Sequence, residues 1–366
     1  MAAASGASII GLLHPRAKPP FSAGPEIALY FREAPRMFAR RTIAATLLSA
    51  LGALAPAAGQ EQSSGLATVE GWMASAARSE IDAELRARVE EAMRSGAYDR
   101  AEALLLEARE AQPESAEVLR LLGGVFFVKG SLLQAAVALK KAEALAPLDE
   151  RSRFTLAMAY VALGRRDWAR PELETLAGSH PRTALYPYWL ARLDYDQTKY
   201  EAAIEKLQRA IGLDPGFAKA FDNLGLCYEA LGRVDEAIRA WQEAIRLNRE
   251  AQPPSPWPAL NLGLLLARLG QLEEAEARFR ESLATDPEFP QAHYQLGLVL
   301  EKTGRPEQAL PELEAAARLE PGYPEPHYAL ARVYRRAGDR EKASRALERF
   351  RELKEQQQSR AEPQSR

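Results

Sequence analysis

The sequence predicts an all-α solenoid, an array of about eight helical hairpins stacked in series. A glycine recurs every 34 residues along most of the chain, and an alanine follows five residues after each of these hinge positions. A fixed period of this length is the signature of a repeat array, in which each unit buries its apolar face against its neighbours. The hinge positions are Gly96, Gly130, Gly164, Thr198, Gly232, Gly270, Gly304 and Gly338, with one longer step of 38 residues after Gly232.

Residues 218–251 show the unit most clearly. Two apolar stripes lie on either side of Gly232, one through Leu224 and Tyr228 and the other through Ala237 and Trp241. Steps of three and four residues place each stripe on one face of a helix. Neither helix could bury that face alone, so the hairpin is expected to pack between two others.

This pattern resembles the tetratricopeptide repeat, whose 34-residue unit has a bulky residue, Leu-Gly, Tyr, Gly, Ala, an aromatic residue, Ala and Pro in fixed places. Residues 218–251 carry Phe221, Leu224-Gly225, Tyr228, Gly232, Ala237, Trp241 and Ala244 in those places. The resemblance implies a right-handed α-solenoid of helix-turn-helix units. The predicted units are 82–115, 116–149, 150–183, 184–217, 218–251, 256–289, 290–323 and 324–357.

Small residues are predicted to bring the two helices of a unit close together. A glycine on the first helix would face the repeat alanine on the second, because a larger side chain would hold the axes apart. The pairs are Gly123 with Ala135, Gly225 with Ala237, Gly263 with Ala275, and Gly297 with Ala309. Stability in such arrays is a sum over units and neighbour interfaces, so no single central core is required.

The first 80 residues do not follow the repeat and have the parts of an export signal. Arg40-Arg41 precede a short apolar run at 42–55, and small residues follow it. This order is typical of a secretory signal, and the run is too short for a comfortable bilayer span. We expect a leader or over-extended gene start at 1–36, a signal peptide at 37–59 that leaves no stable membrane anchor after cleavage, and a linker at 60–81.

This interpretation predicts a periplasmic or secreted protein. The two arginines also fit a twin-arginine export signal loosely, and an uncleaved leader on a cytoplasmic protein is the alternative. At the other end, residues 358–366 lack apolar periodicity and are expected to form a disordered tail.

Charge and cysteine content exclude several functions. The net charge of −2 argues against a nucleic-acid partner, which usually requires a basic face. The single cysteine, Cys227, allows neither an intrachain disulfide nor a cysteine-based metal site, and is expected to be a small buried residue.

The array departs from its own pattern in two places. In the fourth unit Thr198 replaces the hinge glycine, Asp194 stands where a tyrosine is expected, and the first helix should start after Pro187. Between the fifth and sixth units lies the proline-rich stretch 252–258. This stretch is either a protruding loop that offers Trp257 to a partner or an ordinary stiff connection.

The resemblance implies that the first helices line a concave groove, exposed at fixed positions of each unit. Large apolar and aromatic side chains recur at these positions, which indicates a surface for an extended peptide or an amphipathic helix. Packing between adjacent helices is the alternative role for part of this set. The predicted groove residues are Phe127, Phe154, Tyr188, Arg192, Tyr195, Asp222, Leu226, Glu229, Trp257, Tyr294, Tyr328, Arg332, Arg335 and Arg336.

The last three of these arginines have two interpretations. They could hold an acidic segment or a terminal carboxylate, because guanidinium pairs with carboxylate. They could equally form the polar, solvated end of the solenoid. The lysine-and-asparagine clamp of chaperone-binding members of the family is not reproduced.

Nothing in the sequence points to catalysis. His293 and His327 lie one repeat apart without a cysteine or further histidine to complete a metal site, so packing roles are expected. No phosphate-binding glycine loop or nucleophile elbow is present. The sequence therefore predicts a non-catalytic protein-interaction scaffold with no cofactor, no metal and a protein partner. The alternatives are a carbohydrate or small-molecule carrier and a non-catalytic subunit of an envelope enzyme complex.

Overall fold

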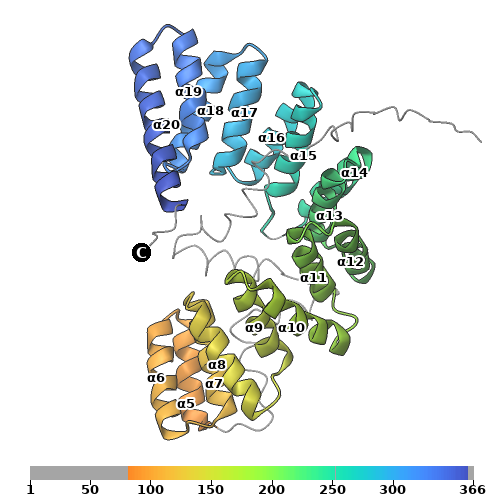
Figure 1. Cartoon of the computed structure of the whole chain (residues 1–366), viewed down its shortest axis with the longest axis vertical. Coiled ribbons are helices and arrows are strands. Elements are labelled where there is room, and N and C mark those ends of the chain that lie inside the picture. The colour runs from red at the N-terminus through yellow and green to blue at the C-terminus, as the bar shows by residue number, and fades with distance from the viewer. Residues whose placement is uncertain (1–80, 252, 362–366) are drawn as a thin grey trace, which may run out of the picture. The chain divides into compact units, whose positions relative to one another are not determined.

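The computed structural model describes residues 81–251 and 253–361, which form sixteen α helices and no strand. The helices pair into hairpins that follow one another in chain order (Figure 1). The first helices are α5 (Ala83–Arg94), α7 (Ala116–Val128), α9 (Glu150–Ala162), α11 (Leu185–Asp196), α13 (Ala218–Ala230), α15 (Trp257–Arg268), α17 (Pro290–Lys302) and α19 (Pro324–Arg336). The second helices are α6 (Tyr98–Ala111), α8 (Leu132–Leu145), α10 (Arg166–Ser179), α12 (Tyr200–Leu213), α14 (Val234–Asn248), α16 (Leu272–Thr285), α18 (Pro306–Leu319) and α20 (Arg340–Ala361).

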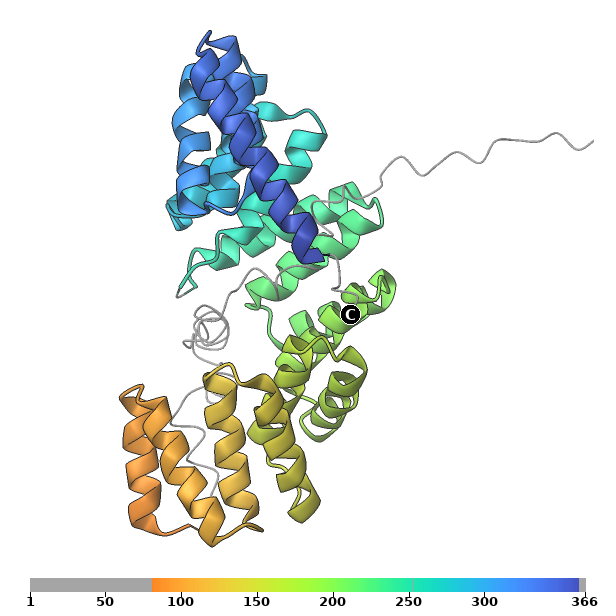
Figure 2. The ribbon, with the colours of Figure 1, turned by 60° about the vertical axis from the view of Figure 1, so that its left-hand side comes forward.

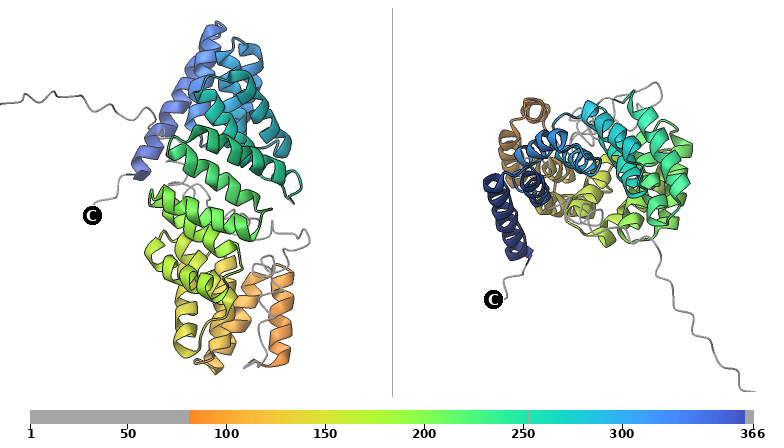
Figure 3. Two further views of the ribbon diagram at one scale, coloured as in Figure 1. Left: turned by 90° about the vertical axis from the view of Figure 1, so that its right-hand side faces the viewer. Right: turned by 90° about the horizontal axis from the view of Figure 1, so that it is seen from above.

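Each helix packs against the next along the chain (Figures 2 and 3). First helices of successive units also contact one another, in the pairs α7 with α9, α11 with α13, α13 with α15, α15 with α17, and α17 with α19. The largest fully buried side chains include Trp241, Tyr186 and Phe279, which lie in three different units. Apolar burial is thus distributed along the array, and the predicted all-α solenoid of about eight units is confirmed.

Left-handed backbone at the hinge turns each first helix into its partner. Gly232 has φ of 72°, and the Arg233 amide donates to the Tyr228 carbonyl at 2.8 Å. The hinge of the fourth unit makes the equivalent bond from Lys199 to Asp194 at 2.9 Å, with Thr198 at φ of 59°. A side chain with a Cβ is strained in this region, whereas glycine is not. The fourth unit therefore keeps the turn at a cost in strain.

Glycines on the first helices make room for bulky side chains on the second. A Cβ added at Gly225 would lie 2.5 Å from Nε1 of Trp241, and one added at Gly123 would lie 2.5 Å from Cγ of Leu139. The sequence prediction paired Gly225 with Ala237 and therefore left out the closest contact, which is Trp241. Ala237 is fully buried, but the side chain that requires the glycine is Trp241, one helical turn further on.

The irregular fourth unit is held by a buried ion network. The Asp194 carboxylate, 3% exposed, lies 2.6 Å from Nη2 of Arg170 and 2.6 Å from Nζ of Lys206. The network joins α10, α11 and α12 where a tyrosine would otherwise pack. Helix α11 begins at Leu185, so the expectation of a start after Pro187 was wrong. The proline is tolerated because it lies in the first turn, where amides have no intrahelical acceptor.

Two other prolines lie inside their helices. α10 begins at Arg166 and α18 at Pro306, so Pro171 and Pro311 both lie in the second turn. Both are exposed, so water can reach the carbonyl that each proline leaves without a helical donor.

The proline-rich connection is fastened at both ends. Asn248 accepts a hydrogen bond from the Ser255 amide and donates one to the Ser255 carbonyl, each at 2.7 Å. The Ser282 hydroxyl donates to the Pro256 carbonyl at 2.9 Å, and Trp257 packs edge-on against Phe289 with ring centroids 4.7 Å apart. These contacts favour an ordinary stiff connection over a protruding loop.

At the C-terminal end, α20 runs for 22 residues where the other second helices from α6 to α18 have 14 or 15. Residues 358–361, predicted as part of a disordered tail, are helical. Glutamine, glutamate and lysine are good helix formers and sustain the helix without apolar periodicity.

None of the helices in the described part of the chain is both long and apolar enough to cross a bilayer. The predicted leader, signal peptide and linker up to residue 80 lie outside the described residues.

Candidate binding surface

The first-helix face is the set of predicted groove positions on α7 to α19. Tyr328, Arg335 and Arg336 are exposed. Five residues are buried: Phe127, Phe154, Tyr188, Leu226 and Tyr294. The remaining six are half-buried: Arg192, Tyr195, Asp222, Glu229, Trp257 and Arg332.

Aromatic side chains on this face pack between units instead of forming an open stripe. The Tyr188 ring lies 4.8 Å from the ring of Phe217, which immediately precedes α13. Tyr294 repeats this contact with Tyr323, before α19, at 5.3 Å. The expectation of exposure was wrong for the five buried members. For Tyr188 and Tyr294 the reason is that an aromatic residue just before the next first helix covers the ring.

A polar cluster occupies the middle of the first-helix face. Asn261 on α15 donates from Nδ2 to Oδ1 of Asp222 on α13 at 2.9 Å. Burial raises the pKa of the Asp222 carboxyl to about 6, while the hydrogen bond from Asn261 and the positive charge of Arg192 limit this rise. Asp222 therefore changes charge near pH 6.

Arg192 places a positive charge beside Asp222, and Lys219 lies three residues before Asp222 on α13. The Arg192 guanidinium lies 5.5 Å from the Trp189 ring and donates from Nη1 to the Tyr188 hydroxyl at 3.5 Å. Burial opposes its charge, but Tyr188 and nearby carboxylates outweigh burial and raise the pKa of Arg192. Burial and the charge of Arg192 lower the pKa of Lys219. The cluster thus concentrates charge on α11 and α13.

An ion pair continues this polar track onto α15. Glu229 on α13 pairs with Arg268, whose pKa is lowered by burial. The sequence prediction named Glu229 but did not list its partner, although Arg268 occupies the same repeat position in its unit as the predicted Arg336 does in the last unit.

Three side-chain amides on successive first helices were also missed. Asn223, Asn261 and Gln295 occupy the sixth position of the fifth, sixth and seventh units. The Asn223 amide donates to the Lys219 carbonyl at 2.8 Å and to the Tyr188 hydroxyl at 3.4 Å. Amides both donate and accept hydrogen bonds, so they suit a peptide backbone. Their recurrence in repeat register was the signal that could have found them.

Two of the three C-terminal arginines, Arg332 and Arg336, pair with one carboxylate. Arg336 lies 3.1 Å from Glu301, whose side chain is 6% exposed, and Arg332 also pairs with it. The Arg332 guanidinium lies 5.6 Å from the ring of Tyr328, which is 46% exposed. Two of the three arginines thus already have a carboxylate, which favours the solvated end over a dedicated carboxylate site.

The two stacked histidines have opposite surroundings. His293 Nδ1 lies 2.6 Å from Glu312 and Nε2 lies 3.0 Å from the Pro287 carbonyl, and the bond to Glu312 raises the pKa of His293. Burial and then the charge of Arg349 lower the pKa of His327. Among the described residues no group of three or more histidine, cysteine, aspartate or glutamate side chains could hold a metal ion. Burial also raises the pKa of the Cys227 thiol to about 12, which keeps it neutral.

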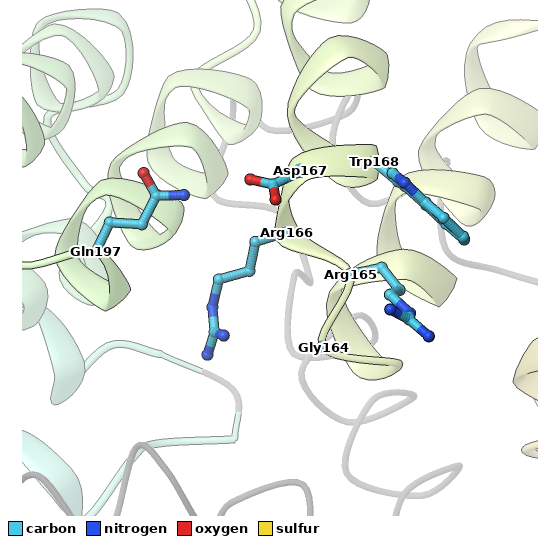
Figure 4. A pocket seen from close by; sticks show the side chains of 6 residues that line it. All are labelled: Gly164, Arg165, Arg166, Asp167, Trp168 and Gln197. Carbon is cyan, nitrogen blue, oxygen red and sulfur yellow. The ribbon is translucent and has the colours of Figure 1, made fainter.

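A pocket of about 300 Å³ lies away from this face, at the turn between α9 and α10 (Figure 4). Trp168 and Arg165 lie on one side of it, while Arg166 extends on the side of Gln197. Arg166 pairs with Asp196 at 2.8 Å, and the Arg165 guanidinium lies 5.2 Å from the Trp168 ring. The side chains that line the pocket are polar except for Trp168, which is itself exposed to solvent.

Family models for the tetratricopeptide repeat match residues 86–150, 154–216, 217–288, 260–324 and 300–362. The chain belongs to the tetratricopeptide-repeat family. Proteins of this family generally bind peptide or protein partners and are generally not catalytic. Among solved structures, the APC/C hetero-tetramer Cut9-Hcn1 has a TM-score of 0.54 at 18% identity and covers 67% of this chain and 48% of that one, which shows the shared fold.

The curated relatives match this chain over only part of their own length. The TPR repeat-containing protein YpiA of Bacillus subtilis is 24% identical over 205 residues, which cover 54% of this chain and 46% of that protein. The type IV pilus assembly protein PilF of Pseudomonas aeruginosa is 26% identical over 163 residues, which cover 44% of this chain and 63% of that protein. The general transcriptional corepressor ssn6 of Schizosaccharomyces pombe is 25% identical over 128 residues, which cover 35% of this chain and 11% of that protein. The chain thus spans less than two thirds of the length of each.

Proposed function

We propose that this protein is a non-catalytic scaffold that binds an extended peptide segment of a protein partner along α11, α13 and α15. The observation that carries the proposal is the bond between Asn261 and Asp222 with Arg192 beside it. This arrangement places charged and amide groups on three successive first helices. The predicted aromatic contacts support it less, because several of them are buried between units.

The repeat spacing suits an extended chain. Neighbouring helix axes lie about 8–10 Å apart, and an extended strand advances about 3.3 Å per residue. Each first helix therefore corresponds to about three residues of the guest. Asn261, which is half-buried, can meet backbone groups, while Arg192 and Asp222 can select charged side chains.

We further propose a location in the cell envelope. The expected signal peptide at 37–59 supports this location, and so does the similarity to PilF, which is described as a type IV pilus assembly protein. Edman sequencing of the mature protein from an envelope fraction tests it. An N-terminus near residues 57–60 is expected, and one upstream of Met37 would contradict it.

Cross-linking in cells followed by mass spectrometry should identify the partner, and a pull-down then tests the surface. Arg192→Ala and Asn261→Ala should each reduce recovery of the cross-linked partner at least about tenfold. The matched control is Arg239→Ala, which removes an exposed arginine from α14 on the other helix layer. Equal recovery by all three variants would show that the first-helix face is not the binding surface.

A carbohydrate carrier is a second candidate, favoured by one observation. Tyr328 is 46% exposed and lies 5.2 Å from the Phe350 ring, so it offers an aromatic face for stacking on a sugar. Glycan-array binding that Tyr328→Ala abolishes, without any protein partner, would favour this function. Tyr294→Ala is unsuitable for the test because Tyr294 is buried and its loss would disturb packing.

A further inference from the structure

The outer surface of the second and third units carries an apolar patch that the other units lack. We define the outer patch as Leu133, Val137, Trp168 and Pro171, all exposed on the second helices α8 and α10. Leu133 is 63% exposed, Val137 is 47% exposed and Trp168 is 56% exposed. Large apolar side chains with this exposure usually indicate a contact surface when they gather in one place.

Comparison between units shows how unusual the patch is. The repeat position of Leu133 is acidic in every other unit, where the residues are Asp99, Asp167, Glu201, Asp235, Glu273, Glu307 and Glu341. An acidic residue in the first turn stabilises a helix through the helix dipole. Trp168 is the only aromatic residue at its own repeat position. Leu133 thus replaces an acidic residue that would stabilise its helix, and it exposes apolar surface instead.

The two helices form one surface. Nζ of Lys140 on α8 lies 3.8 Å from Oε1 of Glu172 on α10, which links the helices. The Trp168 ring packs edge-on against Tyr160 with centroids 5.5 Å apart, and Arg165 lies over it. Leu133 and Val137 are four residues apart on one helix, so they lie on the same face.

Positive charge is concentrated on the α8 side of the patch. Lys140 and Lys141 are exposed there and no carboxylate on α8 is exposed, and Arg165 is exposed beside Trp168. On α10 the border also carries two exposed carboxylates, Asp167 and Glu174. An apolar stripe with lysines along its α8 border complements a helix that has an apolar face and glutamates on the flank that meets α8. A second copy of the chain would oppose lysines to lysines across the contact.

We propose that the outer patch docks an amphipathic helix with acidic flanks from a partner protein. The patch offers few large side chains, and a standard interface buries about 800 Å² per partner, so the contact is weak and micromolar in affinity. This interaction uses the second helices and is independent of peptide binding on the first helices.

The test uses the full chain and a fluorescein-labelled synthetic peptide. The probe is a helix of about five turns with leucines at helical spacing and glutamates on its flanks. Fluorescence anisotropy should show saturable binding that added salt weakens. The combined variant Leu133→Glu, Val137→Arg and Trp168→Gln should weaken binding at least about tenfold. Each new residue occurs at the same position in another unit, so the variant should fold as well as the parent.

Two controls define the outcome. Leu213→Glu changes an exposed leucine outside the patch and should bind as the parent does, and a scrambled peptide of the same composition should not bind. The proposal is overturned if the amphipathic peptide fails to bind or if the combined variant binds it equally well. Patch-dependent dimerisation in sedimentation velocity, or patch-dependent binding to anionic vesicles in place of the peptide, would also overturn it.

Discussion

Asn261 donates a hydrogen bond of 2.9 Å from its side-chain amide to the carboxylate of Asp222, joining α15 to α13. The bond crosses the interface that contains the longest inter-unit connection of the array. Asp222 is partly buried and lies beside Arg192. The charge of its carboxylate therefore affects the contact between the fifth and sixth units. This coupling makes the middle of the first-helix face sensitive to pH.

Asp222→Asn should remove a pH-dependent destabilisation. The pKa of Asp222 in the folded protein is about 6, above the ordinary value of 3.8. The stability linked to its protonation is therefore fully present below pH 3.8 and is lost as the pH rises through 6. At pH 7.5 the variant should be more stable than the parent by about 2 kcal/mol, after allowance for partial exposure. Near pH 4.5 this gain should be much smaller.

Urea unfolding at both pH values measures the difference, and comparison of the two proteins cancels the other titrating groups. The asparagine amide oxygen can still accept from Asn261, so the hydrogen bond survives the change. A difference that did not vary with pH would mean that Asp222 is ionised without penalty.

The effects of His293→Gln and His327→Gln on stability should depend on pH in opposite directions. Hydrogen bonding to Glu312 raises the pKa of His293, so its contribution is present below pH 6.5 and is lost as the pH rises through the folded value. Burial lowers the pKa of His327, so its contribution is present above pH 6.5 and is lost as the pH falls through the folded value. At pH 5.5, His293→Gln should destabilise by about 1–2 kcal/mol.

Thermal unfolding at pH 5.5 and pH 8.5 separates the two cases. Losing His293 should matter more at the lower pH, whereas losing His327 should matter less there. The histidines occupy the same repeat position one unit apart, so each variant is the matched control for the other. The same direction of pH dependence in both variants would contradict the proposed role of Glu312.

Repeat spacing predicted the fold, and it did so because glycine and alanine positions depend on backbone geometry within one unit. Exposure on the first-helix face was harder to predict. Tyr188 and Tyr294 are covered by Phe217 and Tyr323, and those contacts depend on how the next unit approaches. The same is true of Asp194, whose partners Arg170 and Lys206 come from two other helices. Side-chain exposure and ion pairs that depend on contacts with other helices were therefore harder to predict from the sequence than the backbone geometry within one unit.

Thr198→Gly should stabilise the fourth unit. Thr198 adopts φ of 59°, where the seven described hinge glycines have φ between 71° and 81°. Removing the side chain relieves about 1–2 kcal/mol of strain, and the greater freedom of glycine in the unfolded chain offsets part of this gain. The net increase should be about 0.5–1 kcal/mol by urea unfolding. The converse change, Gly232→Ala, should destabilise by a similar amount, and a stabilising effect there would contradict the role of the left-handed hinge.

Gly225→Ala should destabilise the fifth unit by overpacking. The added Cβ would lie 2.5 Å from Nε1 of Trp241, which is fully buried and donates to the Asp222 carbonyl at 3.1 Å. Neither the ring nor its hydrogen bond can move freely, so the cost should be about 1–3 kcal/mol. Gly212→Ala is the matched control, because a Cβ at Gly212 in α12 meets nothing within 4 Å. Alanine is the better helix former, so this variant should gain up to about 1 kcal/mol. Destabilisation of similar size in both variants, measured by urea unfolding, would show that the contact with Trp241 does not limit the approach of α13 and α14.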